Sequence, residues 1–265
     1  FIQQNVEKLR KSAILVDPNF EEGKAKVAEP DDILQAAIAA LGRSGPLAGK
    51  KILITAGSTA EHIDPIRVVT NTSSGKMGIA IARQAESMGA RVTLVYGRGI
   101  EIPSASKVIQ VSTGKDMLDA VTTELRKGYD VAIMAAAVAD FKPSSISATK
   151  IDTRSGGVRL SLTPTKKIIN EVKKIDEDIF LVAFKADYKV SDVVLTDRAF
   201  KKLDECRADL VVANDLYRKG SGECSDTAEV FIVDGEKKIE HLPLAKKQQI
   251  ARRLLEIIAH RLKHN

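Results

Sequence analysis

From residue 51 onward, short apolar runs alternate with amphipathic stretches of helical length. The apolar runs predict strands at 51–55, 91–96, 107–111, 130–135, 179–184, 209–214 and 228–233. Between and after them, apolar positions with a period near 3.6 predict helices at 75–88, 115–127, 165–174, 191–206 and 244–263. Strands that are apolar on both faces and alternate with helices indicate a mostly parallel sheet covered by helices.

The first 45 residues follow a different pattern. Residues 1–26 are highly charged around one apolar patch, Ala13–Val16. Pro30 then opens a predicted helix over 31–41, whose first turn carries the acidic residues that a helix N-terminus favours. We therefore place a boundary near residue 45, between a tail or linker at 1–45 and a larger domain at 46–265.

Composition narrows the class of protein. The 265 residues are 44% hydrophobic and 29% charged, which is typical of a globular protein, and no apolar run approaches the roughly 20 residues of a membrane span. Two cysteines, Cys206 and Cys224, exclude a disulfide scaffold and favour a cytoplasmic location. The net charge of +6 favours anionic ligands. Because only 4% of residues are aromatic, we expect small phosphates rather than nucleic acid, which remains an alternative.

One segment has the features of a phosphate site. Ligands of such sheets bind beyond the carboxyl ends of the strands, so the loops after Thr55, Ala135, Phe184 and Asn214 are expected to converge. The stretch Asn71-Thr-Ser-Ser-Gly-Lys-Met-Gly78 leads into a predicted helix, and its glycines and serines suit a phosphate.

This segment matches neither of two common phosphate motifs. Met77 replaces the Ser or Thr of a P-loop, and Ser73 replaces the first glycine of a dinucleotide fingerprint. A capped helix packed on the sheet remains an alternative. An NADP-binding reductase that uses Ser73–Gly75 and Arg98 is another, although no Tyr-x-x-x-Lys spacing supplies its proton donor.

Four blocks of the sequence together carry a family resemblance. They are Ile54–Gly57 with Asp64–Arg67 and Thr70–Gly78; Ala135–Phe141 followed by Lys150-Ile151; Ala183–Ala186; and Val212–Asp215. In this order, over residues 48 to about 262, they resemble the phosphopantothenate–cysteine ligase family. Glu22–Leu34 resembles the end of the flavin-dependent decarboxylase domain that many members carry upstream. The resemblance implies the ligase part of a bifunctional protein, with FMN only in the missing decarboxylase part.

The resemblance also implies a fold and a reaction. The fold is α/β: a Rossmann-like, mostly parallel sheet with helices on both faces and a C-terminal antiparallel extension. The reaction joins 4′-phosphopantothenate to L-cysteine in coenzyme A biosynthesis, with CTP, through an acyl-cytidylate, and releases pyrophosphate and CMP. We expect Mg²⁺ to be held by phosphate oxygens and water, so no dedicated metal-ligand cluster is expected. Family members are homodimers, in which segments around Lys150–Leu162 reach toward the partner.

Two departures from the bacterial pattern bear on the nucleotide. Asp152-Thr153 follows Lys150-Ile151 where bacterial members commonly have two lysines, and Lys185–Tyr188 replaces Ala-Ala-Glu-Thr. Both are closer to archaeal and eukaryotic members, and the eukaryotic ones use ATP. CTP is therefore expected, with ATP as the alternative.

Site residues follow from the same resemblance. Asn71 and Lys150 are the expected catalytic residues, Asn71 at the carboxyl group of the substrate and Lys150 near the reacting phosphate. The residues expected to contact phosphopantothenate are Arg67, Asn71, Ala136, Ala137 and Asp140. Those expected to contact the nucleotide are Gly57, Ser73, Gly75, Gly78, Asp140, Lys150, Lys166, Lys167, Ile168, Ile169, Phe184, Lys202 and Asn214. The lysines at 246 and 247 are assigned to a solvated helix face.

Overall fold

The computed structural model describes residues 45–101, 105–222 and 224–263, and also positions 5, 6, 9, 13, 15, 16, 18–21, 24–28, 30, 33 and 37. In the N-terminal part, β1 (Asn19–Glu21) and β2 (Lys24–Lys26) form an antiparallel pair. The predicted helix at 31–41 lies largely outside the described residues, and of the decarboxylase-like segment Glu22–Leu34 the structure describes 24–28, 30 and 33.

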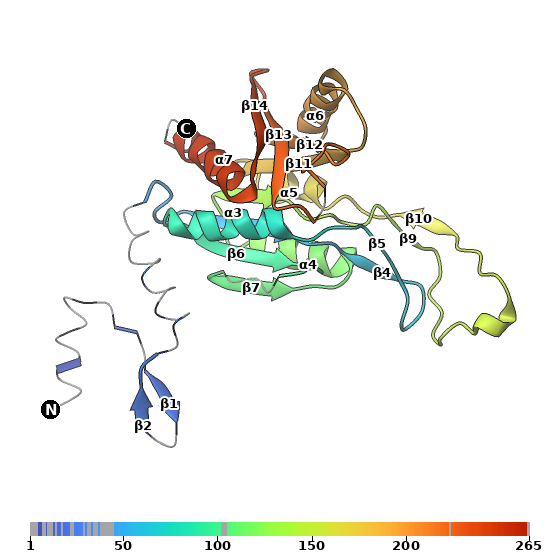
Figure 1. Cartoon of the computed structure of the whole chain (residues 1–265), viewed down its shortest axis with the longest axis horizontal. Helices are drawn as coiled ribbons and strands as arrows, with labels where there is room; N and C mark the ends of the chain where they lie inside the picture. The colour runs from blue at the N-terminus through green and yellow to red at the C-terminus, as the bar shows by residue number, and fades with distance from the viewer. Residues whose placement is uncertain are drawn as a thin grey trace.

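An eight-stranded sheet forms the centre of the larger domain (Figure 1). Its order is β14-β13-β12-β11-β8-β3-β6-β7. The strands are β3 (Lys51–Ala56), β6 (Arg91–Tyr96), β7 (Lys107–Gln110), β8 (Val131–Met134), β11 (Phe180–Asp187), β12 (Leu210–Asp215), β13 (Thr227–Asp234) and β14 (Ile239–Lys246). All neighbours from β7 to β12 are parallel, whereas β13 and β14 pair antiparallel. Numbered along the chain, the parallel strands follow the order 3-2-1-4-5-6, which confirms a Rossmann-like sheet with a C-terminal antiparallel extension.

Helices cover both faces of this sheet because side chains of successive strand residues point to opposite sides. In β3, Ile52 and Ile54 pack toward α3 (Lys76–Ser87) and α7 (Lys247–Arg261). Leu53 packs toward the other face. That face is covered by α4 (Gly114–Leu125), α5 (Ile169–Ile175) and α6 (Asp192–Cys206). Within the described residues, no helix is both long and apolar enough to span a bilayer.

The predicted strands agree with the structure to within three residues at each end, but two elements differ. The helix predicted to begin at residue 165 begins at Ile169, so Lys166 and Lys167 precede it. The strand β14 lies where no strand was predicted, and α7 accordingly begins at Lys247 rather than 244. Pro243 interrupts the strand pattern, and it is accommodated because β14 is the edge of the sheet.

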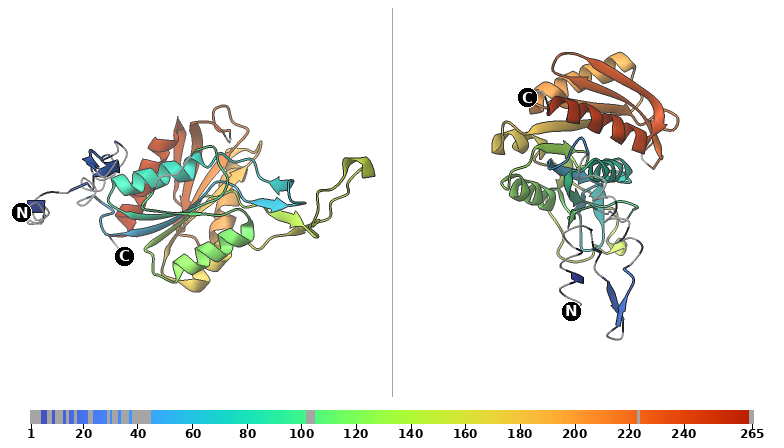
Figure 2. Two further views of the ribbon diagram at one scale, coloured as in Figure 1. Left: turned by 90° about the horizontal axis from the view of Figure 1, so that it is seen from below. Right: turned by 90° about the vertical axis from the view of Figure 1, so that its left-hand side faces the viewer.

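Two small hairpins project from one side of the domain (Figures 1 and 2). One pairs β4 (Ala60–His62) with β5 (Val68–Thr70). The other, residues 141–164, pairs β9 (Phe141–Pro143) with β10 (Leu162–Pro164) and is called the arm below. The two are joined by a hydrogen bond from Ser147 N to Ile63 O of 3.0 Å. Five apolar side chains of the arm are exposed: Phe141, Ile146, Val158, Leu160 and Leu162.

Glu124, in the last turn of α4, is a buried carboxylate that joins three parts of the chain. Its side chain is 5% exposed and accepts hydrogen bonds from Lys107 Nζ at 2.8 Å, Lys127 Nζ at 2.6 Å and Tyr129 Oη at 2.9 Å. Burial acts to raise the pKa of Glu124, but these hydrogen bonds outweigh it and lower the pKa to about 2. A lowered pKa means that the carboxylate stabilises the fold fully above the ordinary glutamate pKa of about 4.5, and that this contribution is lost as pH falls toward 2.

We therefore expect Glu124→Gln to lower the free energy of unfolding at neutral pH by about 1–3 kcal/mol, because three donors lose a charged acceptor. The variant should also lose less stability than the parent between pH 4.5 and 2. Thermal melts at pH 7, 4 and 3 check both effects. Asp119→Asn, at an exposed ion pair with Lys115 on the same helix, is the control and should change stability little. Equal acid sensitivity of Glu124→Gln and the parent would contradict the expectation.

Candidate functional site

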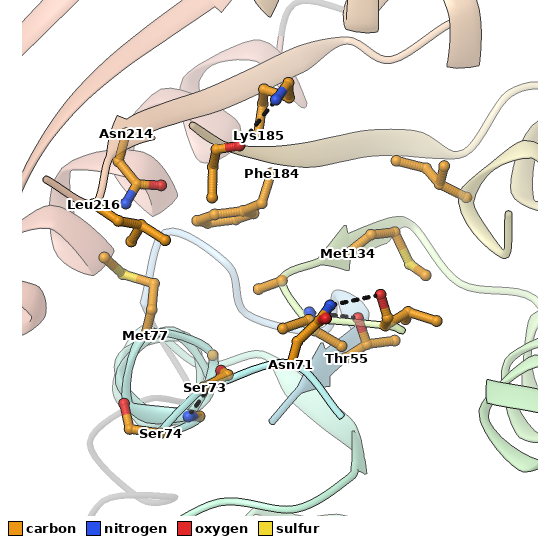
Figure 3. Close-up of a pocket in the computed structure, with 18 of the residues that line it drawn as sticks. Thr55, Asn71, Ser73, Ser74, Met77, Met134, Phe184, Lys185, Asn214 and Leu216 are labelled. Atoms are coloured by element: carbon orange, nitrogen blue, oxygen red, sulfur yellow. Dashed lines mark hydrogen bonds between the residues drawn. The ribbon is translucent and has the colours of Figure 1, made fainter. Parts of the chain in front are cut away.

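A cavity of about 570 Å³ opens at the carboxyl ends of β3, β8, β11 and β12 (Figure 3). Thr55, Ala135, Phe184 and Asn214, one from each strand end or the loop after it, line it. The predicted convergence of these four loops is therefore confirmed. The cavity lies where the strand order reverses between β3 and β8, the place at which open α/β sheets bind ligands.

The segment Asn71–Gly78 forms one wall of the cavity and leads into α3. Gly75 is the N-cap residue, with φ 76°, and its N–H donates to Ser73 Oγ at 3.4 Å. No described side chain caps the helix, although the N–H groups of a first turn have no partner inside it. The wall thus offers backbone donors and hydroxyls at the positive end of a helix dipole, an arrangement that suits a phosphate.

Two glycines let the backbone pack closely beneath this wall. A Cβ on Gly78 would lie 2.4 Å from Ala56 Cβ, so only glycine lets α3 start against the end of β3. Gly57 has φ 77°, and a Cβ there would lie 2.5 Å from Arg98 O. Gly78 lines the cavity, whereas Gly57 lies behind the wall and next to Gly75.

The loop that follows β8 adjoins this wall and is held by hydrogen bonds. Ala136 N donates to Thr55 Oγ1 at 3.2 Å, and Ala139 N donates to Thr59 Oγ1 at 2.9 Å. The side chain of Asn71 donates from Nδ2 to Val138 O at 3.0 Å. These bonds place Asn71, Ala136 and Ala137 together on the cavity lining, with the amide of Asn71 fixed in orientation.

Cationic side chains lie along the rim. Asp140 forms an ion pair with Lys167 at 2.5 Å, and Lys166 forms one with Glu171 at 3.0 Å. Both lysines are exposed and line the cavity together with Ile168 and Ile169. Exposed pairs of this kind contribute little to stability, so these lysines can exchange their carboxylate partners for a bound anion.

The third side of the cavity is less polar. Phe184 is half-buried in β11, three residues before the strand ends, and Asn214 lies near the end of the neighbouring β12, paired with Ala186. Figure 3 shows both facing the wall that carries Asn71 and Ser73, with Leu216 close to Met77. Lys202 reaches the same side from α6. A flat aromatic side chain and an amide that line the same side of a cavity can accept a planar heterocycle.

Three of the expected site residues do not line the cavity: Gly57, which lies behind the wall, Arg67 and Lys150. Arg67 forms an ion pair with the buried Asp64 and donates from Nη1 to Ile151 O at 3.2 Å. Asp64 Oδ2 in turn accepts from Ile151 N at 3.2 Å. Lys150 is exposed on the arm, beside this junction. Within one chain, Arg67 therefore anchors the arm, which projects from the domain (Figures 1 and 2), and Lys150 on this arm does not line the cavity.

The junction depends on an ionised Asp64. Burial acts to raise its pKa, but three backbone N–H donors and the Arg67 guanidinium hold the pKa well below its ordinary value.

We expect Arg67→Ala to leave the buried carboxylate of Asp64 without its cation and to release the base of the arm. Cleavage of residues 144–161 by thermolysin should become about tenfold faster, with the melting of the sheet nearly unchanged. Arg154→Ala, at an exposed pair with Asp152 on the same arm, should cleave at the parent rate. Parent-like cleavage of Arg67→Ala would contradict this role.

The lining residues that sequence reasoning missed include Lys76 and Lys247. The assignment of Lys247 to a solvated face was wrong, because its side chain is half-buried and lines the cavity. Arg98, which an NADP site would need, lines a separate groove with His62 and Gln110. Within the described residues, no group of three or more His, Cys, Asp or Glu side chains is arranged to hold a metal ion.

Comparison of the sequence with known proteins finds one matching family model and several similar proteins. Residues 47–262 match the model of the DNA/pantothenate metabolism flavoprotein C-terminal domain. The chain is 44% identical over 260 residues to the coenzyme A biosynthesis bifunctional protein CoaBC of Thermococcus kodakarensis, covering 97% of this chain and 62% of the relative. With the CoaBC of Methanocaldococcus jannaschii it shares 34% identity over 257 residues, covering 96% of this chain and 62% of that protein. The chain thus spans under two thirds of the length of these relatives.

A solved structure agrees with the fold. The C-terminal domain of a coenzyme A biosynthesis bifunctional protein CoaBC superposes with a TM-score of 0.69 at 34% identity. The superposition covers 84% of this chain and all of that domain.

Proposed function

The chain belongs to the family of the DNA/pantothenate metabolism flavoprotein C-terminal domain, and from that premise we propose that it is a phosphopantothenate–cysteine ligase of coenzyme A biosynthesis. The observation that carries the proposal is the single cavity in which the four sequence blocks meet. Its relatives of 44% and 34% identity are named as bifunctional proteins of coenzyme A biosynthesis.

The reaction proceeds in two displacements. A carboxylate oxygen of 4′-phosphopantothenate attacks the α-phosphorus of CTP, forming an acyl-cytidylate as pyrophosphate leaves. The amine of L-cysteine then attacks the acyl carbon; the amide forms, CMP leaves, and the amine loses a proton to water. Both steps bring anions together, so the protein must position the reactants and offset negative charge.

The phosphate wall receives the nucleotide. Ser73, Gly75 and Gly78 bring hydroxyl and backbone N–H donors to the triphosphate, and Gly57 maintains the close packing behind them. Lys166 and Lys167 neutralise charge from the rim, and Lys202 does so from α6. Phe184 and Asn214 accept the base, next to Ile168 and Ile169.

Asn71 hydrogen-bonds to the carboxyl group of phosphopantothenate that reacts. Its amide is held by Val138 O at the junction of the phosphate wall and the Ala136–Asp140 loop. An amide both donates and accepts hydrogen bonds, which suits a group that changes from carboxylate to acyl phosphate. Ala136 and Ala137 have small side chains that let the backbone approach phosphopantothenate, and Asp140 borders the same space.

The cavity also fits a magnesium ion bound with the nucleotide. The carboxylates of Asp140 and Glu205 are on the lining, and Mg²⁺ usually keeps several waters and binds through one or two carboxylates plus phosphate oxygens. When bound, the ion would supply neutralisation of phosphate charge.

A second copy of the chain is the partner that fits the arm. Its five exposed apolar side chains extend from the domain, and Ile66 of the neighbouring hairpin is exposed as well. A monomer that exposes such residues along one projection has a surface suited to association. We place Lys150 in the partner's site, because its own cavity does not include it. Residues 1–45 then form the link to an upstream decarboxylase that carries FMN.

The ligase activity is tested directly by product release. The purified chain with Mg²⁺, CTP and 4′-phosphopantothenate should release pyrophosphate, and adding L-cysteine should release CMP. Omitting 4′-phosphopantothenate is the control and should abolish pyrophosphate release. A parallel assay with ATP distinguishes the two nucleotides. No pyrophosphate with either nucleotide would overturn the proposal.

A further inference from the structure

Lys76 lies where the phosphate wall becomes a helix. It is the first residue of α3, its side chain is 18% exposed, and it lines the nucleotide cavity. Its Nζ donates to Asp226 Oδ1 at 2.6 Å and to Cys224 O at 3.1 Å. Asp226 itself is 83% exposed, on the loop before β13.

Lys247 lies next to Lys76 although 171 positions separate them in the sequence. It is the first residue of α7, which packs along α3, and both lysines line the nucleotide cavity and a second cavity of about 450 Å³ behind it. Burial, followed by the charge of Lys76, lowers the pKa of Lys247. Within the described residues, no carboxylate accepts a hydrogen bond from Lys247 Nζ.

This arrangement is unfavourable without an anion. The ammonium groups of Lys76 and Lys247 repel each other. Each also lies at the N-terminus of a helix, where the macrodipole disfavours a cation. Neither helix has an acidic residue in its first turn. Asp226, and more weakly Glu101, partly compensate for two cations and two helix ends. Local choices that oppose stability are expected where a ligand completes the charge balance.

We propose that Lys76 and Lys247 bind the pyrophosphate end of the nucleotide, and that Asp226 is an internal anion that this end displaces. The proposal rests on the proposed ligase function and adds residues to its site. The pair lies where the Ser73–Gly78 wall enters α3, on the lining of both cavities, where the β- and γ-phosphates extend if the α-phosphate faces Asn71. Both cations would stabilise the charge that develops on pyrophosphate as it leaves.

Displacement of Asp226 is easy because the carboxylate is exposed. Such an ion pair contributes little to stability, so a phosphate that carries more charge replaces it readily. The loop keeps a second attachment, a hydrogen bond from Lys247 N to Asp226 O of 2.9 Å, which stays intact when the side chain turns away. A bound triphosphate therefore replaces the contact between the Asp226 side chain and Lys76, and the loop that carries Asp226 stays folded.

Calorimetric titration of the full chain with CTP, CMP and inorganic pyrophosphate, in the presence of Mg²⁺, tests the inference. Lys247→Ala and Lys76→Ala should each weaken CTP and pyrophosphate binding about 10- to 100-fold and CMP binding less than about twofold. Lys247→Arg, which keeps the charge, should remain near the parent. Arg252→Ala, at an exposed pair with Glu256 on the same helix, is the matched control and should bind all three like the parent.

Two more measurements separate this role from a structural one. Lys247→Ala should melt no lower than the parent, because it relieves repulsion with Lys76. Asp226→Asn should bind CTP about two- to fivefold more tightly, because the competing anion is lost. If the parent binds CTP and Lys247→Ala binds it equally well, the inference is overturned while the ligase function stands. If the parent binds neither CTP nor ATP, the ligase function itself fails.

Discussion

Asn71→Asp is expected to reduce kcat about 10²- to 10³-fold while the protein remains folded. The substitution removes the Nδ2 donor that bonds to Val138 O and puts a negative charge where a carboxylate meets a triphosphate. Loss of one positioned donor to a developing charge has this magnitude in enzymes. Because Asn71 is exposed at the lip of the cavity, the melting temperature should change by no more than a few degrees.

Separate measurement of the two displacements locates the defect. Pyrophosphate release reports the first step, and CMP release after addition of L-cysteine reports the second. Asn170→Asp introduces the same change at an exposed residue of α5 that is not on the cavity lining, and its rates should stay within about twofold of the parent. Parent-like rates for Asn71→Asp would remove this residue from the mechanism.

The second large effect is expected at Lys150. Lys150→Gln should reduce pyrophosphate release about 10²-fold or more, because a cation near the reacting phosphate is lost. Nucleotide binding to the variant should change much less, since the Ser73–Gly78 wall and the rim lysines Lys166 and Lys167 still contact the nucleotide. Comparison of the CTP dissociation constant with the rate of pyrophosphate release checks both statements. Arg154→Gln, at another exposed cation of the arm, is the control.

Mixed dimers test whether Lys150 acts across the subunit interface. A heterodimer of an Asn71→Asp chain and a Lys150→Gln chain, purified with two tags, holds one complete site if the arm of each chain serves its partner. It should then show about half of the parent's activity per dimer. If Lys150 serves its own chain, both sites are defective and the mixture stays inactive. Sedimentation of the parent as a monomer at assay concentration would also contradict the arrangement.

The central strands could be predicted from sequence because burial on both faces leaves a plain signal. Runs such as Ile52–Ile54 and Leu210–Ala213 are apolar throughout, and only the middle of a covered parallel sheet accepts such segments. Once these strands are parallel, their carboxyl ends must meet at one edge. The convergence of Thr55, Phe184 and Asn214 follows from topology alone.

The small hairpins and the positions of Lys247 and Arg67 could not be predicted, because they depend on contacts between distant residues that leave no periodic pattern in the sequence. The three-residue strands of the small hairpins are too short to show alternation. Lys247 follows a helical pattern that gives no sign of α3 beside it, so its place in the cavity could not be foreseen. Arg67 belongs to a recognisable motif, yet its side chain is held by Asp64 and the arm rather than by the cavity.

The strand order also sets a sequence of events during synthesis. β3 is the first strand of the sheet to leave the ribosome, but one of its two neighbours, β8, follows about eighty residues later, and β11 must pair with β8 after that. The phosphate wall is therefore complete in sequence long before Phe184, Asn214 and Lys247 exist. Long-range parallel pairing of this kind is slow, and nascent chains stay open meanwhile. We therefore expect the proposed nucleotide binding to be acquired only when α7 has emerged and docked on α3, so that binding would report completed folding.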